Sequence, residues 1–110
     1  MAQVAPKTHR HIDILLGTTT ETWSGLPETE RTIEEWDPVD QNVFLAEWPL
    51  EEQRLEMLRE YAASGAMTKA QLERYHKLQK LVEENRPVVD RLFAGWVTAA
   101  ESRRRQGLEP

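Results

Sequence analysis

The sequence predicts a mainly α-helical protein, a small helical bundle built on an antiparallel helical hairpin over about residues 49–84 and a C-terminal amphipathic helix over about residues 87–104. Three observations support this fold class. Apolar residues recur with helical spacing through the second half of the chain, prolines stand where helices can begin, and a Ser-Gly-Ala-Met-Thr turn separates two apolar segments. With 110 residues, 39% of them hydrophobic, the chain is long enough to bury the core of one domain.

The N-terminal part of the chain is the least regular. We expect residues 1–26 to form an N-terminal arm that is flexible or partly extended. The stretch His11–Leu16 alternates polar and apolar residues as a strand does, but it also fits one helical turn capped by Thr8 and stopped by Gly17. The run Thr18–Thr22 is rich in β-branched residues, which favours an extended segment or a loop.

A helical domain over residues 27–105 should follow this arm, with short helices near 27–36 and 38–48 that pack against the hairpin. Proline is tolerated at the first position of a helix because its missing N–H would be unpaired there anyway. Pro27, Pro38 and Pro49 therefore predict helix starts, with Asp37 as an N-cap. In the helix over 38–48, we expect four apolar residues to share one packed stripe, namely Val39, Val43, Phe44 and Trp48.

The hairpin has the clearest local signals. Gly65 suits the left-handed position after a helix, and Thr68 with Gln71 predicts a capping box at the start of the next helix. Over Arg54–Val82, about a quarter of the chain, this pattern with Gln71-Leu72 and Tyr75 resembles the short C-terminal helical hairpin module called SHOCT. The resemblance implies a role in protein interaction.

Pro87 should break or kink the second arm of the hairpin and begin the last helix. This helix carries the strongest amphipathic stripe of the chain, and it ends on three consecutive arginines. The stripe consists of Val89, Leu92, Phe93, Trp96, Val97 and Ala100. Residues 106–110 are predicted to be a disordered tail.

Known catalytic motifs are missing from the sequence. It has no nucleotide-binding glycine loop, no hydrolase nucleophile elbow and no zinc-protease motif, and without cysteine it has no thiolate chemistry. His9, His11 and Asp13 could line up as metal ligands if that segment were extended, but they lie in the predicted flexible arm. His76 is expected at a helix surface or core edge. We therefore predict neither an enzyme nor a cofactor or metal site.

Charge is distributed unevenly along the chain. Residues 21–60 hold 12 acidic against 3 basic residues, whereas residues 61–110 hold 6 acidic against 9 basic residues. This acidic body argues against wholesale binding of nucleic acid and is compatible with a basic protein partner. No apolar run is long enough to span a bilayer, and no signal peptide is recognisable, so we expect a cytoplasmic protein that does not bind membranes.

These features predict a non-catalytic protein-binding or oligomerisation module. In size, acidity and lack of motifs it is similar to small bacterial antitoxins, which implies that residues 1–30 become ordered on a partner. Alternatives are a nucleic-acid-associated regulator that uses the basic helix end and a homo-oligomeric structural protein. The residues predicted to bind a partner are Trp23, Trp36, Trp48, Phe93, Arg103, Arg104 and Arg105.

Overall fold

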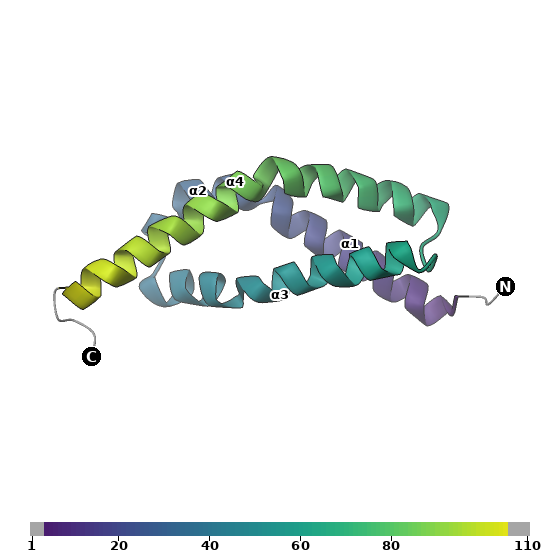
Figure 1. Ribbon diagram of the computed structural model, residues 1–110, viewed down its shortest axis with the longest axis horizontal. Coiled ribbons are helices and arrows are strands. Elements are labelled where there is room, and N and C mark those ends of the chain that lie inside the picture. The colour runs from purple at the N-terminus through teal and green to yellow at the C-terminus, as the bar shows by residue number, and fades with distance from the viewer. Residues whose placement is uncertain (1–3, 106–110) are drawn as a thin grey trace.

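A computed structural model describes the backbone of residues 4–105 and the side chains of residues 4–95. In this range the protein consists of helices joined by short turns and contains no strand (Figure 1). The elements are α1 (Pro6–Ser24), α2 (Leu26–Thr32), the 3₁₀ helix η1 (Ile33–Glu35), α3 (Pro38–Ala63) and α4 (Lys69–Arg105). The prediction of a small, mainly α-helical bundle is confirmed. The predicted tail over 106–110 lies outside the described residues.

Helix α1 corrects the prediction of an irregular or partly extended N-terminal segment. Pro6 stands at its first position, and Gly17 lies within it instead of stopping it. The helix forms because its buried residues recur at helical spacing and face the rest of the bundle. These residues are Ile12, Leu15, Leu16, Thr19 and Trp23. Tertiary burial thus outweighs the low helix propensity of glycine and threonine.

The threonine run is compatible with a helix, because two of its hydroxyls bond to the preceding turn. The hydroxyl of Thr18 donates to the carbonyl of Ile14 at 3.0 Å, and the hydroxyl of Thr22 donates to the carbonyl of Thr18 at 3.1 Å. Bonding to the preceding turn satisfies these hydroxyls inside a helix, so they do not demand a loop. The prediction of an extended or loop segment over Thr18–Thr22 is therefore wrong.

Two of the three prolines that predicted helix starts do mark them. Pro27 lies in the first turn of α2, and Pro38 opens α3, where the Asp37 carboxylate accepts a 2.8 Å hydrogen bond from the backbone N–H of Val39. Pro49 instead lies inside α3, which continues without interruption to Ala63. Its ring lies on the exposed side of the helix, so it does not interrupt the core-facing side of α3. The predicted helices over 38–48 and 49–64 are therefore one helix.

The turn between α3 and α4 forms as predicted. Gly65 adopts a left-handed φ of 78°, and the N–H of Ala66 donates to the carbonyl of Tyr61 at 3.1 Å, as in a Schellman motif. The capping box is complete, because the N–H of Gln71 donates to the Thr68 hydroxyl at 3.1 Å and the N–H of Thr68 donates to Oε1 of Gln71 at 2.9 Å. Local sequence therefore determines this turn.

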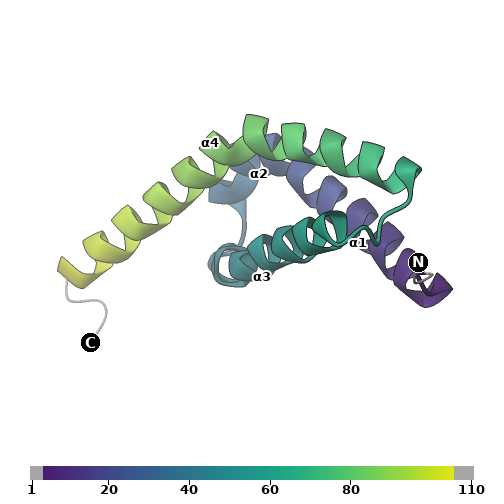
Figure 2. The same ribbon diagram turned by 45° about the vertical axis from the view of Figure 1, so that its right-hand side comes forward.

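Helix α4 includes both the second arm of the hairpin and the predicted C-terminal helix. It runs unbroken through Pro87, and Figure 2 shows it bending near its middle. Proline removes one backbone hydrogen bond and crowds the preceding turn, which bends a helix without necessarily ending it. The kink that the sequence predicted is confirmed, whereas a separate helix start at Pro87 is not observed.

The core lies where α1 crosses between the two arms of the hairpin (Figure 1). Helix α1 packs on α4 most extensively and on α3 as well, so it fills the space that the diverging arms leave open. The core includes Ile12, Leu16, Trp23, Leu26, Trp48, Leu58, Leu78 and Val89. Gln71 of α4 is hydrogen-bonded to α1, since its side-chain N–H₂ donates to the carbonyl of His9 at 3.1 Å and to the Asp13 carboxylate at 2.9 Å.

Candidate protein-binding surface

Two of the tryptophans predicted to bind a partner lie in the core. Trp23 is fully buried and Trp48 is 4% exposed, with their ring centroids 5.3 Å apart in an edge-on arrangement. The guanidinium of Arg86 lies 4.9 Å from the Trp23 ring, within the range of a cation–π contact. Both tryptophans thus hold α1 against the hairpin, which corrects their predicted role at a binding surface.

The other predicted binding residues have different positions. Trp36 is half-buried at the corner between η1 and α3, where its indole N–H donates to the Thr32 hydroxyl at 3.2 Å. Its ring packs edge-on against Phe44, 5.7 Å away between centroids. Phe93 is half-buried against the core. The backbone of Arg103, Arg104 and Arg105 forms the last turn of α4, and their side chains lie outside the described residues.

The histidine pair of the N-terminal segment does not form a shared site. Because α1 is helical, His9 and His11 are about 200° apart around its axis and face different directions. The His11 ring contacts Tyr61 edge-on, and Asp13 is bound to Gln71 and Arg74. Among the described residues, no group of three histidines or acidic residues is arranged to hold a metal ion. His76 is exposed, as expected for a residue at a helix surface.

Helix α3 carries a row of apolar side chains that faces solvent. Val39 is 66% exposed, Val43 46% and Leu50 52%. At about 100° per residue, these positions and the exposed Ala46 fall within one narrow sector of the helix. We call Val39, Val43, Ala46 and Leu50 the α3 stripe. It is the largest alignment of exposed apolar side chains among the described residues.

The α3 stripe corrects the prediction that Val39, Val43, Phe44 and Trp48 share one packed face. Val39 and Trp48 are nine residues apart, which places them about 180° apart around the helix. Trp48 therefore enters the core, while Val39 points away from it. Phe44 lies between these directions and is half-buried against Trp36 and Trp48.

Acidic residues flank one side of the α3 stripe. Asp40 and Glu47 are exposed and lie about 80–100° from Val39 around the helix axis. Within the described part of the chain, neither carboxylate pairs with a cation. An apolar row beside unpaired carboxylates can contact apolar side chains and cations of a partner at the same time.

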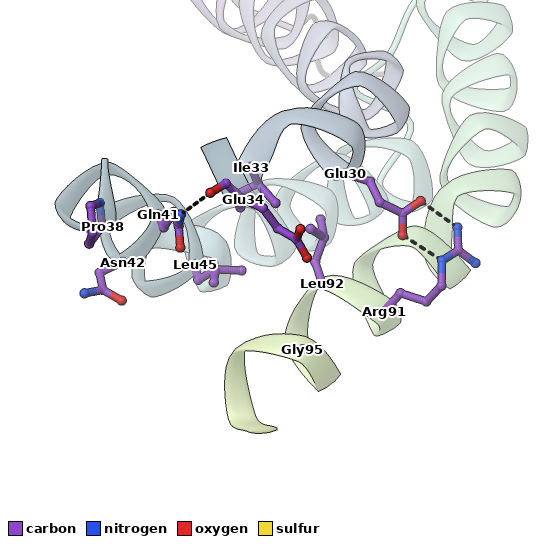
Figure 3. Close-up of a pocket in the computed structure, with 10 residues that line it drawn as sticks. All are labelled: Glu30, Ile33, Glu34, Pro38, Gln41, Asn42, Leu45, Arg91, Leu92 and Gly95. Atoms are coloured by element: carbon purple, nitrogen blue, oxygen red, sulfur yellow. Dashed lines mark hydrogen bonds and ion pairs between the residues drawn. The ribbon is translucent and has the colours of Figure 1, made fainter. Parts of the chain in front are cut away.

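A pocket of about 330 Å³ lies nearby, where α4 leaves the bundle (Figure 3). Ile33 of η1, Leu45 of α3 and Leu92 of α4 give it an apolar wall, and Glu34 lies at its edge. Gly95 contributes no side chain, and a Cβ placed there would meet no atom within 4 Å. At Gly95, therefore, no side chain of that residue narrows the pocket.

An ion pair between α2 and α4 borders this pocket. The guanidinium of Arg91 binds the Glu30 carboxylate through two contacts, Nε to Oε2 at 2.6 Å and Nη2 to Oε1 at 2.9 Å (Figure 3). These hydrogen bonds lower the pKa of Glu30 and raise the pKa of Arg91. The pair connects α2 to α4 at the point where α4 turns away from the bundle, and it leaves Glu34 as the acidic group at the open edge.

A second set of charges lies between α3 and α4. Arg86 binds Glu52, with Nη1 to Oε1 at 2.9 Å, and this hydrogen bond raises the pKa of Arg86. Glu52 also accepts a 3.3 Å hydrogen bond from the Trp48 indole. Beside it, burial raises the pKa of Glu51, although Arg54 pairs with one of its oxygens. The Arg86–Glu52 pair is structural, because it links α4 to α3 and both of its members contact a core tryptophan.

The chain matches no protein-family model, and no curated protein or solved structure is significantly similar to it. Its likeness to the SHOCT module thus rests on the capped hairpin alone. Within residues 4–105, no helix combines the length and apolar character needed to cross a bilayer. Evidence on function therefore comes from the surface itself.

Proposed function

We propose that this protein is a non-catalytic, cytoplasmic protein-binding module whose α3 stripe binds a basic amphipathic helix of a partner. The observation that carries the proposal is the exposure of three large apolar side chains on one face of α3, 66% at Val39, 46% at Val43 and 52% at Leu50. Single exposed apolar residues are common on protein surfaces, but an aligned row of them is typical of a contact site.

The geometry of the α3 stripe fits a helical partner. From Val39 to Leu50 it runs for three turns, about 17 Å along the axis. A second helix can lay apolar residues at every third or fourth position along such a row. Full burial of one large apolar side chain contributes about 1.5–3 kcal/mol, so three partly buried ones support a reversible complex.

The charge around the α3 stripe favours a basic partner. Asp40 and Glu47 lie beside it, and residues 21–60 carry nine more acidic than basic residues. Lysine or arginine on the polar flank of a partner helix would speed association and lose much of that effect at high salt. An acidic partner helix would instead be repelled.

An adaptor role suits this surface better than an antitoxin-like role. A wrapping mechanism uses a segment that becomes ordered on the partner, whereas residues 6–24 are packed as a helix in the protein itself. In the proposed function the partner helix becomes ordered on the preformed surface of α3 instead.

The direct test is fluorescence anisotropy with a labelled helical peptide of leucine and lysine, about five turns long, so that it covers the stripe. The triple substitution Val39→Ser, Val43→Ser and Leu50→Ser should weaken binding by at least about tenfold. A matched control is Ile14→Ser, which removes an apolar side chain that is 63% exposed on α1, outside the stripe. This control should leave binding unchanged.

A second comparison tests the charge. A peptide in which glutamate replaces lysine should not bind, and binding of the lysine peptide should weaken as salt is added. Equal loss of binding in the Ile14→Ser control, or equal binding of both peptides, would overturn the proposal. Once a cellular partner is known, the same triple variant tests whether that partner uses the α3 stripe.

A further inference from the structure

The C-terminal part of α4 extends past the rest of the bundle. Figures 1 and 2 show its ribbon continuing beyond the ends of α2 and α3. The molecule is 61 Å long and has a radius of gyration of 17.4 Å. A compact chain of this length has a radius of about 13 Å. Among the described residues, no other helix accompanies the last turns of α4.

This projecting helix end has an amphipathic sequence. Positions 92, 93, 96, 97 and 100 are all apolar and fall at helical spacing, and the helical backbone continues to Arg105. The pattern therefore runs on past the point where α4 leaves the bundle. An apolar helical stripe in such a place gains stability when a second molecule covers it.

The pocket at the base of this projecting end provides a complementary surface. Its wall of Ile33, Leu45 and Leu92 is apolar, and Gly95 leaves room for an incoming side chain. Glu34 lines the pocket and is exposed, and Glu35, the next residue of η1, is exposed as well. The projecting end, by contrast, finishes with three arginines. One chain thus carries both halves of a complementary contact.

We propose that two copies of the chain pair through their projecting α4 ends, each end filling the pocket of the other copy. In an antiparallel pair centred near position 97, position 103 of one copy is level with position 91 of the other. Arg91 at that level is already neutralised by Glu30, so positions 103–105 of each copy come level with a pocket whose remaining acidic group is Glu34, next to Glu35 in the sequence. Such an interface is self-complementary and closes at two copies, as most homo-oligomers do.

This pairing is distinct from the proposed function. The α3 residues that line the pocket point on average about 120° away from the α3 stripe around the helix axis, so we expect a dimer to leave the stripe open for a partner helix. The triple serine variant of the α3 stripe should therefore dimerise like the unchanged protein. Failure of peptide binding and failure of dimerisation can be observed separately.

A charge swap tests the pairing by sedimentation equilibrium. In one variant Glu34→Lys and Glu35→Lys make the pocket edge basic, and in the other Arg103→Glu and Arg104→Glu make the helix end acidic. Each variant alone brings like charges together twice per dimer and should raise the dissociation constant at least about tenfold. An equal mixture of the two restores attraction at both contacts and should restore the dimer.

Each outcome of this experiment either supports the proposed dimer or overturns it. We expect the unchanged protein to dimerise at micromolar concentration, with far-UV circular dichroism showing the same helix content in both variants. A protein that remains monomeric at about 1 mM would overturn the proposal. So would dimers that persist in both separate variants, or a mixture of folded variants that fails to pair.

Discussion

Trp23 and Val39 are both apolar residues on helices of this protein, but the first is fully buried and the second is 66% exposed. They represent two regions. The packed region comprises α1 and the sides of the hairpin arms that face it, and the open region comprises the solvent-facing side of the first half of α3 and the projecting end of α4. In the packed region, apolar side chains contact each other across three helices. In the open region, a row of them faces solvent.

The difference follows from the path of α1. This helix crosses the hairpin and covers both arms near the turn, as Figure 1 shows. It ends at Ser24, and the shorter α2 continues along α4, while the outer side of α3 stays uncovered. The packed region therefore accounts for folding, and the open region retains apolar surface for other molecules.

The largest expected effect is a difference in the free energy of unfolding between a substitution in the packed region and one in the open region. Trp23→Ala removes a fully buried ring that contacts Trp48 and Arg86, and it should lower the free energy of unfolding by about 3–5 kcal/mol. Val39→Ala should change it by less than about 0.5 kcal/mol, because an exposed side chain loses little on truncation. Urea denaturation followed by circular dichroism measures both. Similar losses in the two variants would show that the open region is part of the folding core.

The next effect concerns the buried amide that joins α1 to the start of α4. Gln71→Ala removes a capping hydrogen bond and two bonds to α1, and we expect a loss of about 2 kcal/mol. The matched control is Gln79→Ala, on the exposed side of the same helix. It should change the free energy of unfolding by less than about 0.5 kcal/mol. The two thermal unfolding curves give the comparison directly, and equal midpoints would contradict the role assigned to Gln71.

Two glycines should respond in opposite directions. Gly65→Ala forces a side chain into a left-handed conformation and should lower stability by about 1 kcal/mol. Gly95→Ala, within a helix and with free space around it, should raise stability by about 0.5–1 kcal/mol. The same alanine narrows the pocket, so it should also weaken the proposed dimer. A stabilised Gly95→Ala protein that dimerises as before would place the contact elsewhere.

The smallest effects concern pH. Burial raises the pKa of Glu51, so its contribution to stability falls as the pH rises above the ordinary glutamate value of 4.5. The hydrogen bond from Arg91 lowers the pKa of Glu30, so its contribution is present above 4.5 and is lost as the pH falls through the lowered pKa. At about pH 7 the free energy of unfolding should therefore be higher for Glu51→Gln and lower for Glu30→Gln than for the unchanged protein, in each case by less than about 1 kcal/mol. A destabilised Glu51→Gln variant or a stabilised Glu30→Gln variant would contradict the environments assigned to these two carboxylates.

Features set by neighbouring residues could be predicted from the sequence. The Schellman turn at Gly65, the capping box of Thr68 and Gln71 and the N-cap at Asp37 each need only a few adjacent positions. Helix α1 was missed because Gly17 and the threonines have low helix propensity, although the spacing of its buried residues carried the signal. Counting 100° per residue would also have separated Val39 from Trp48.

The pocket and the placement of the tryptophans depend on contacts between elements that the sequence does not contain. The pocket requires the relative placement of η1, α3 and α4, which the packing of α1 and α2 determines. Whether a tryptophan enters the core or the surface likewise depends on which elements cover its helix. Trp23 and Trp48 illustrate this, because their residue type suits both roles.

Hydrogen–deuterium exchange with and without the leucine–lysine peptide tests the central claim most directly, because it reports which region the partner covers. We predict that the peptide slows exchange in fragments spanning residues 38–50 and leaves α1 and the start of α4 unchanged. Slower exchange in α1, or no change over 38–50 when the peptide is bound, would contradict the assignment of binding to the open region.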